Sequence, residues 1–132
     1  MPSCFSIVAA GHCALLVALL PTATWAQVQP APSAQTLNLD TPGFSVRIEL
    51  RCKEGEVTCE NVTYRGKSKK TGKSVVLTGK TAHTLCADKV TPCRFIGYVF
   101  KTGTFTYLVT EQGELIVRNG QNAIVSESGT WQ

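Results

Sequence analysis

Apolar and polar residues alternate along most of the chain after Phe44, and glycine-containing turns separate the alternating segments. The clearest segment is 45–52, which places one set of side chains on each face of a strand: Val46, Ile48, Leu50 and Cys52 inward, and Arg47, Glu49 and Arg51 outward. A period of two residues is typical of a strand with one buried face. No stretch after Phe44 has helical periodicity for more than one turn.

Seven further segments have strand character: residues 57–65, 74–78, 81–85, 94–100, 104–110, 114–118 and 122–127. The turns between strands are predicted at Thr71-Gly72, Gly79-Lys80, Thr102-Gly103, Gln112-Gly113 and Asn119-Gly120. The last is the strongest turn signal, because a two-residue type I′ turn needs positive φ at both central positions. The pattern predicts an all-β domain, a small antiparallel eight-stranded meander that closes into a barrel or folds into a sandwich. Trp131 is expected at the barrel seam or over one end of the core.

The first 26 residues have a different pattern, with no charged side chain and an apolar run that ends at Pro21. Thr24 and Ala26 place small residues at the two positions that a signal peptidase reads, so residues 1–26 are predicted to be a signal peptide cleaved after Ala26. Residues 27–43 are rich in Pro, Ala and Gln and predict a flexible leader. Residues 44–132 then form one β domain without a transmembrane span, in the periplasm or outside the cell.

Four cysteines follow the predicted cleavage point, and all three disulfide pairings are open to them in principle. The segments 52–59 and 86–93 share the spacing C-x6-C, and each has a turn-like centre. This faint repeat favours the pairs Cys52–Cys59 and Cys86–Cys93. In each segment the second cysteine is out of phase by one residue with the aliphatic residue and tyrosine that follow, which predicts a bulge after Cys59 and another after Cys93. A four-cysteine zinc site would need closer ligand spacing.

The charge distribution is uneven, because 13 basic and 9 acidic residues leave the chain basic and no acidic residue lies between Arg65 and Ala87. The lysines of this stretch are interpreted either as a solvated hairpin tip or as a patch that steers an acidic partner. Anionic lipid or lipopolysaccharide is a further candidate, whereas nucleic acid is not, since no aromatic residue interleaves with the lysines. Together with the second cysteine loop, the predicted partner-binding residues are Lys67, Lys69, Lys70, Lys73, Asp88 and Lys89.

No motif predicts catalysis, a metal or a cofactor. The spacing of residues 66–74 does not match a phosphate-binding loop. His83 is the one histidine after the predicted cleavage point, and no acid lies near it in sequence. Glu54, Glu56 and Glu60 lack the spacing of a calcium loop and are interpreted as a solvated acidic turn. The chain is therefore predicted not to be an enzyme.

The predicted signal peptide, chain length, disulfide framework and eight-stranded barrel resemble the membrane-bound and periplasmic inhibitor family of c-type lysozymes. That family carries the motif Ser-Gly-x-x-Tyr. The nearest string here is Thr102-Gly103-Thr104-Phe105-Thr106-Tyr107, with threonine for serine and one additional residue, so the inhibitory residues are not carried over. The resemblance implies a periplasmic protein that binds and inhibits a protein partner, either a lysozyme-like enzyme or a secreted toxin effector. The alternatives are a binder of envelope lipid, glycan or lipopolysaccharide through the basic hairpin, and a structural component of the envelope.

Overall fold

The computed structural model describes residues 25–26 and 34–132. Its strands are β1 (Gln35–Asp40), β2 (Phe44–Leu50), β3 (Val62–Ser68), β4 (Ser74–Leu85), β5 (Pro92–Thr102), β6 (Phe105–Thr110), β7 (Glu114–Asn119), β8 (Asn122–Ser128) and β9 (Thr130–Trp131). The predicted signal peptide, up to residue 24, and residues 27–33 of the predicted leader lie outside the described residues. Within the described part of the chain, no helix has the length and apolar character needed to cross a membrane.

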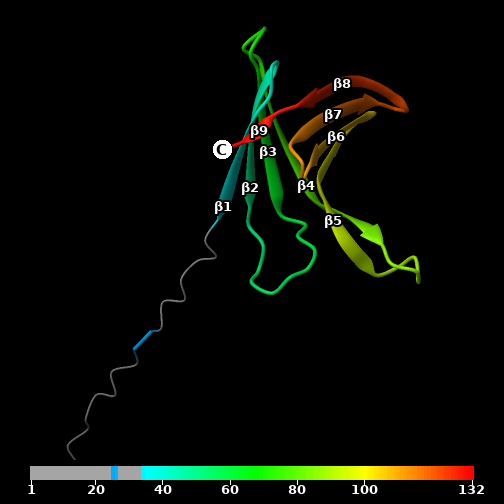
Figure 1. The fold of residues 1–132 in the computed structure, drawn as a ribbon. Coiled ribbons are helices and arrows are strands. Elements are labelled where there is room, and N and C mark those ends of the chain that lie inside the picture. Colours follow the sequence, from blue (N-terminus) through cyan, green and yellow to red (C-terminus); the bar gives the residue numbers. More distant parts are fainter. Residues whose placement is uncertain (1–24, 27–33) are drawn as a thin grey trace, which may run out of the picture.

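Each strand from β1 to β7 pairs antiparallel with the next one along the chain, which confirms the predicted meander. After β8 the chain passes to the other edge of the sheet, where β9 pairs with β1 through Leu39↔Trp131 and Asp40↔Thr130. The result is a nearly closed antiparallel barrel (Figure 1). Trp131 therefore lies at the seam, as predicted, and its indole Nε1 donates a hydrogen bond to the Glu111 carbonyl at 2.9 Å.

The inward positions of the alternating pattern fill the barrel. Tyr64 on β3 lies at the centre, with its ring centroid 5.2 Å from that of Phe100 and 5.4 Å from that of Tyr107. Burial, with a smaller effect from Tyr107, raises the pKa of Tyr64. Large fully enclosed side chains come from six strands, β1 to β3 and β5 to β7: Leu39, Ile48, Val62, Tyr64, Phe100, Val109 and Leu115.

The domain begins earlier than the composition indicates. Residues 35–40, placed in the flexible leader by the sequence prediction, form β1, and the predicted start at Phe44 is therefore wrong. Leu39 and Thr41 are each 1% exposed. A segment poor in apolar residues is ordered here because it pairs with β2 along its full length and also with β9.

The predicted break at Gly79-Lys80 is also wrong, since β4 runs without interruption from Ser74 to Leu85. Gly79 pairs with Phe100 inside the sheet, and a Cβ atom at this position would lie 2.1 Å from the Val99 carbonyl oxygen. Glycine is thus required for a close approach between strands and not for a turn. One uninterrupted strand here, together with β1 and β9, gives nine strands in place of the predicted eight.

The last hairpin is present, but its turn is shifted by one residue from the prediction. Asn119 pairs with Asn122, so Gly120 and Gln121 are the central residues. Only Gly120 has positive φ (60°). This pattern fits a type II′ turn, which needs positive φ at the first central position alone, and not the predicted type I′ turn.

Both predicted disulfides are confirmed: Cys52 bonds to Cys59, and Cys86 bonds to Cys93. They place the protein in an oxidising, extracytoplasmic environment. The predicted bulges are also confirmed. The register of β4 with β5 shifts on both sides of His83. The Cys59 carbonyl accepts a hydrogen bond from the Thr81 N–H, and Val62 pairs with Gly79. The chain therefore advances three residues from Cys59 to Val62 while β4 advances two from Gly79 to Thr81, which leaves one extra residue after Cys59.

Candidate functional site

The two disulfide-closed loops lie at the same end of the barrel. The first loop, residues 52–59, follows β2, and the second, residues 86–93, joins β4 to β5. The β3–β4 hairpin, residues 67–73, projects from the opposite end (Figure 1). We refer to the end with the two cysteine loops as the loop end and to the opposite hairpin as the basic hairpin.

At the loop end the two loops diverge, because the irregular pairing around His83 bends the β4–β5 hairpin away from the rest of the sheet (Figure 1). Cys59 stays attached to β4 through two contacts with Thr81: its N–H donates to the Thr81 hydroxyl, and its carbonyl accepts from the Thr81 N–H, both at 2.9 Å. The base of the first loop is therefore fixed to β4, while the second loop extends outward. The divergence leaves a hollow between the loops.

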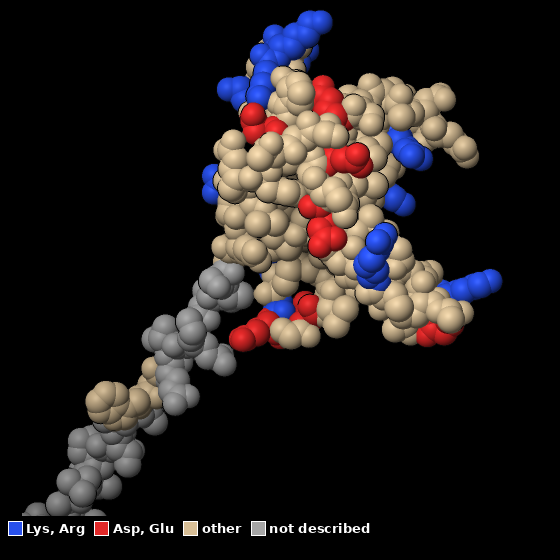
Figure 2. Space-filling model, in the orientation of Figure 1, with Lys and Arg blue, Asp and Glu red and all other residues tan. Residues whose placement is uncertain are grey.

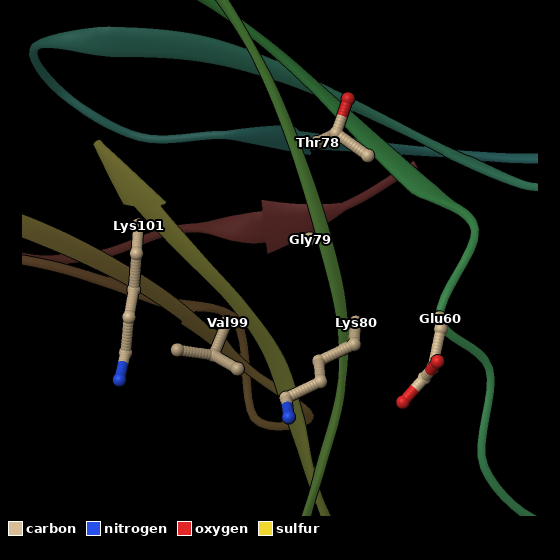
Figure 3. A pocket seen from close by; sticks show the side chains of 6 residues that line it. All are labelled: Glu60, Thr78, Gly79, Lys80, Val99 and Lys101. Atoms are coloured by element: carbon tan, nitrogen blue, oxygen red, sulfur yellow. The ribbon is translucent and has the colours of Figure 1, made fainter.

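The hollow has a volume of about 350 Å³ and lies between the chain before β3 and the β4–β5 hairpin. It is continuous with a second hollow of about 340 Å³ on the outer face of β4 and β5, with which it shares Glu60, Lys80 and Val99. Figure 3 shows this second hollow, where Glu60 and Lys80 face one another and Lys101 extends on the far side of Val99. The lining offers one carboxylate, two ammonium groups and an aliphatic surface.

The second loop is held in one conformation by its own side chains. The Asp88 carboxylate accepts hydrogen bonds from the Val90 and Thr91 N–H groups, at 3.0 and 2.9 Å, and from the Thr91 hydroxyl. These hydrogen bonds, that from the hydroxyl first, lower the pKa of Asp88. Lys89 has φ of 59°, a left-handed conformation that non-glycine residues rarely adopt. The loop is thus preorganised by the disulfide, the Asp88 hydrogen bonds and the backbone of Lys89.

Exposed aliphatic side chains gather on the loops and were missed by the sequence analysis. Val57 in the first loop is 71% exposed, and Val90 in the second is 78% exposed. Leu85, just before Cys86, is 58% exposed and also lines the hollow. Val57 was placed in a predicted strand over residues 57–65, but β3 begins at Val62, so the start of that prediction is wrong and Val57 lies in the loop. Which loops share one end of the barrel depends on pairing between strands that are distant in sequence.

The predicted partner-binding residues do not form one surface. Asp88 and Lys89 lie at the loop end, whereas all four predicted lysines lie in the basic hairpin, at the other end of the 12-residue strand β4. At about 3.3 Å per residue, β4 separates the two groups by about 40 Å. Asp88 stabilises its own loop, and Lys69 is bound to Asp40. A compact interface can therefore contain one group or the other, but not both.

The His83 side chain has a packing role, whereas Glu54, Glu56 and Glu60 are exposed. The His83 ring packs edge-on against Phe95, with centroids 5.5 Å apart. Among the described residues, no group of three His, Cys, Asp or Glu side chains is arranged to hold a metal ion.

Comparison of the chain with protein-family models, curated sequences and solved structures gives no match. A function is therefore inferred from the geometry of the barrel and its loops.

Proposed function

We propose that this protein is exported to the periplasm or beyond, after cleavage near Ala26, and binds a protein partner through its loop end. The binding surface comprises the two disulfide-closed loops and the hollow between them. Its effect is to neutralise the partner, a lytic enzyme such as a lysozyme or a secreted toxin. No reaction is assigned to the protein itself.

The observation that carries this proposal is the contrast between the filled barrel and its open loop end. Tyr64, Phe100 and Tyr107 pack together in the interior and occupy the middle of the barrel. The hollows of the loop end are on the outside, between loops that covalent bonds and hydrogen bonds hold in place. Loops that are ordered before binding lose little conformational entropy when a partner docks, which favours affinity.

The exposed aliphatic side chains favour a protein as the partner. Val57 and Val90 are exposed on the two loops, and Leu85 lines the wall of the hollow. Apolar groups at the centre of a contact with polar groups around it are typical of protein interfaces. Here Glu60 and Lys80 supply polar groups beside the aliphatic ones, and these can fix the orientation of the partner.

The resemblance to lysozyme inhibitors supports only the proposed kind of partner, a lytic enzyme, and not the residues that bind it. The string nearest to the family motif spans the β5–β6 hairpin, where Thr102 pairs with Phe105. The Tyr107 ring packs against Tyr64, with centroids 5.4 Å apart, and is half-buried. Because the string departs from the family motif in both residue type and spacing, the proposed contact with lysozyme is placed at the loop end.

Capture by the immobilised protein tests the proposal. The oxidised protein, purified after export, is offered c-type lysozyme and, separately, an envelope extract of the producing organism. We expect it to retain an enzyme and to lower the activity of that enzyme in proportion to the amount added. A Val57→Asp, Val90→Asp variant should lose both effects, because two buried carboxylates would have no partner at the interface.

Val76→Asp is the matched control, because Val76 is also an exposed valine but lies on β4 toward the basic hairpin. This variant should retain the enzyme as the unaltered protein does. The proposal is wrong if the double loop variant binds and inhibits normally, or if Val76→Asp weakens binding to the same degree.

A further inference from the structure

The basic hairpin is the most strongly charged surface of the molecule. Lys67, Lys69, Lys70 and Lys73 are all exposed within seven residues, and residues 67–73 contain no acidic side chain. Figure 2 shows their positive charge gathered at the end of the molecule where the hairpin projects. The loop end, in contrast, carries exposed side chains of both signs, among them Glu54, Glu56 and Lys89.

Lys69 differs from the other three lysines because it holds the hairpin to the barrel. Its Nζ lies 2.9 Å from the Asp40 carboxylate and donates a hydrogen bond to the Thr41 carbonyl at 2.6 Å. Its backbone N–H donates to the Gly43 carbonyl at 2.8 Å. These contacts join the hairpin to the β1–β2 connection, so the hairpin projects in a defined direction.

The tip itself is closed by backbone hydrogen bonds. The Ser68 N–H donates to the Lys73 carbonyl at 2.9 Å, and the Gly72 N–H donates to the Ser68 carbonyl at 2.8 Å. Gly72 has φ of 72°, which a glycine adopts without strain. The remaining lysines, Lys67, Lys70 and Lys73, form no ion pair within the described part of the chain, and they extend from this closed tip into solvent.

We infer that the basic hairpin docks the protein on a membrane surface that carries anionic phospholipid. Lysine ammonium groups on flexible stems act as point charges and do not need the fixed geometry of a bidentate arginine contact. Each lysine near an anionic bilayer adds to the attraction, which makes a cluster effective. Apart from the lysines, the tip offers only Ser68, Thr71 and Gly72, and none of these can fill a pocket in a protein.

This docking also sets the orientation of the molecule. The basic hairpin and the loop end are separated by the length of β4, so contact with a membrane leaves the two disulfide loops directed away from it. The docking inference rests on the lysines alone and does not depend on the proposed protein partner. Where both hold, the loops are presented to partners that approach the envelope.

Vesicle binding tests the inference. The oxidised protein, purified after export, is mixed with vesicles of phosphatidylcholine or of phosphatidylcholine containing phosphatidylglycerol, and binding is measured by sedimentation at several salt concentrations. We expect binding to the anionic vesicles only, and weaker binding at higher salt. A Lys67→Ala, Lys70→Ala, Lys73→Ala variant should bind about 100-fold more weakly, given the usual effect of each lysine near such a surface.

The matched control removes three cations from the loop end: Lys53→Ala, Lys89→Ala and Arg94→Ala. This variant has the same net charge as the hairpin variant and should bind within about threefold of the unaltered protein, because its substitutions lie beyond the Debye length of about 10 Å from the docked surface. Equal losses in the two variants, or equal binding to neutral and anionic vesicles, would overturn the inference. So would binding to soluble polyglutamate without binding to vesicles, since this result would identify an acidic protein as the ligand.

Discussion

The Thr41 hydroxyl donates a hydrogen bond of 2.7 Å to the Glu127 carboxylate, joining residues 86 positions apart in the sequence. The same carboxylate accepts the Gly43 N–H at 2.9 Å. Because Thr41 follows β1 and Glu127 lies on β8, these contacts connect the two ends of the meander beside the short β9 pairing. Side-chain contacts thus supplement the β1–β9 ladder at the seam of the nearly closed barrel.

Removing this carboxylate should weaken the closed barrel. Glu127→Ala leaves the Thr41 hydroxyl and the Gly43 N–H without their shared acceptor, and hydrogen bonds to charged groups contribute about 1.5–3 kcal/mol each. We expect the free energy of unfolding to fall by about 2 kcal/mol in urea denaturation. Glu114→Ala, at the exposed start of β7, is the control and should change it by less than about 0.5 kcal/mol. Equal effects in the two variants would rule out a special role for the seam.

The two disulfides should differ in their effect on stability. Closing loops of this length contributes about 2.5 kcal/mol in the chain-entropy model, which applies to both. Cys59 is also buried in the core, whereas Cys93 is exposed. Paired alanine substitution at Cys52 and Cys59 should therefore lower the unfolding free energy more than paired substitution at Cys86 and Cys93. Thermal unfolding of the two variants measures the difference, and the reverse order would contradict the assignment of Cys59 to the core.

Gly79 should tolerate no side chain. In Gly79→Ala the new methyl group would meet the Val99 carbonyl and the Phe100 ring, so the two strands must separate, and overpacking of this kind costs about 3 kcal/mol. Gly103 has φ of 55° but open space around it. Gly103→Ala, the matched control, should therefore cost only about 1 kcal/mol of backbone strain. Unfolding in guanidinium chloride compares them, and similar losses would show that close strand approach is unimportant.

The order of the second disulfide loop should depend on pH through Asp88. Its pKa is lowered below the ordinary value of 3.8 by hydrogen bonds that its charged form accepts. The stabilisation is therefore complete above that value and is lost as the pH falls through the lowered pKa in the folded protein. We expect the Val90 and Thr91 amides to lose protection from hydrogen exchange in acid. In Asp88→Ala they should lack protection even at neutral pH, whereas unchanged protection in that variant would contradict the prediction.

Alkaline conditions should weaken the core through Tyr64. Burial raises its pKa above the ordinary value of 10.0, so the folded protein retains a proton that the unfolded chain releases. Stability from this group is present below pH 10.0 and declines as the pH rises above it. Tyr64→Phe keeps the ring but cannot titrate, and its stability should fall less steeply over this range. Tyrosinate absorbance and circular dichroism follow both changes, and parallel curves for the two proteins would exclude Tyr64 as the cause.

Local chemistry explains which features were predictable. Both disulfides join cysteines seven positions apart, a distance at which short loop closure favours the nearest partner. The strands with alternating residues, such as β2, were recognised because each has one buried face. The bulges after Cys59 and Cys93 were visible as a change of phase. In each case the deciding residues are neighbours in the sequence.

The remaining features depend on contacts between residues distant in sequence. β1 is a strand because β2 and β9 supply its hydrogen-bond partners, although its own composition resembles that of a linker. In the sequence Gly79 resembles a turn residue, but in the sheet it allows the close approach of Val99. Lys69 has no acidic neighbour in sequence, but in the sheet it forms an ion pair with Asp40 of β1. The separation of the basic hairpin from the loop end also follows only from the uninterrupted strand β4. The sequence by itself therefore determined the strands and the covalent loops, while the closed sheet alone decided which residues share a surface, because pairing between strands sets their positions in space.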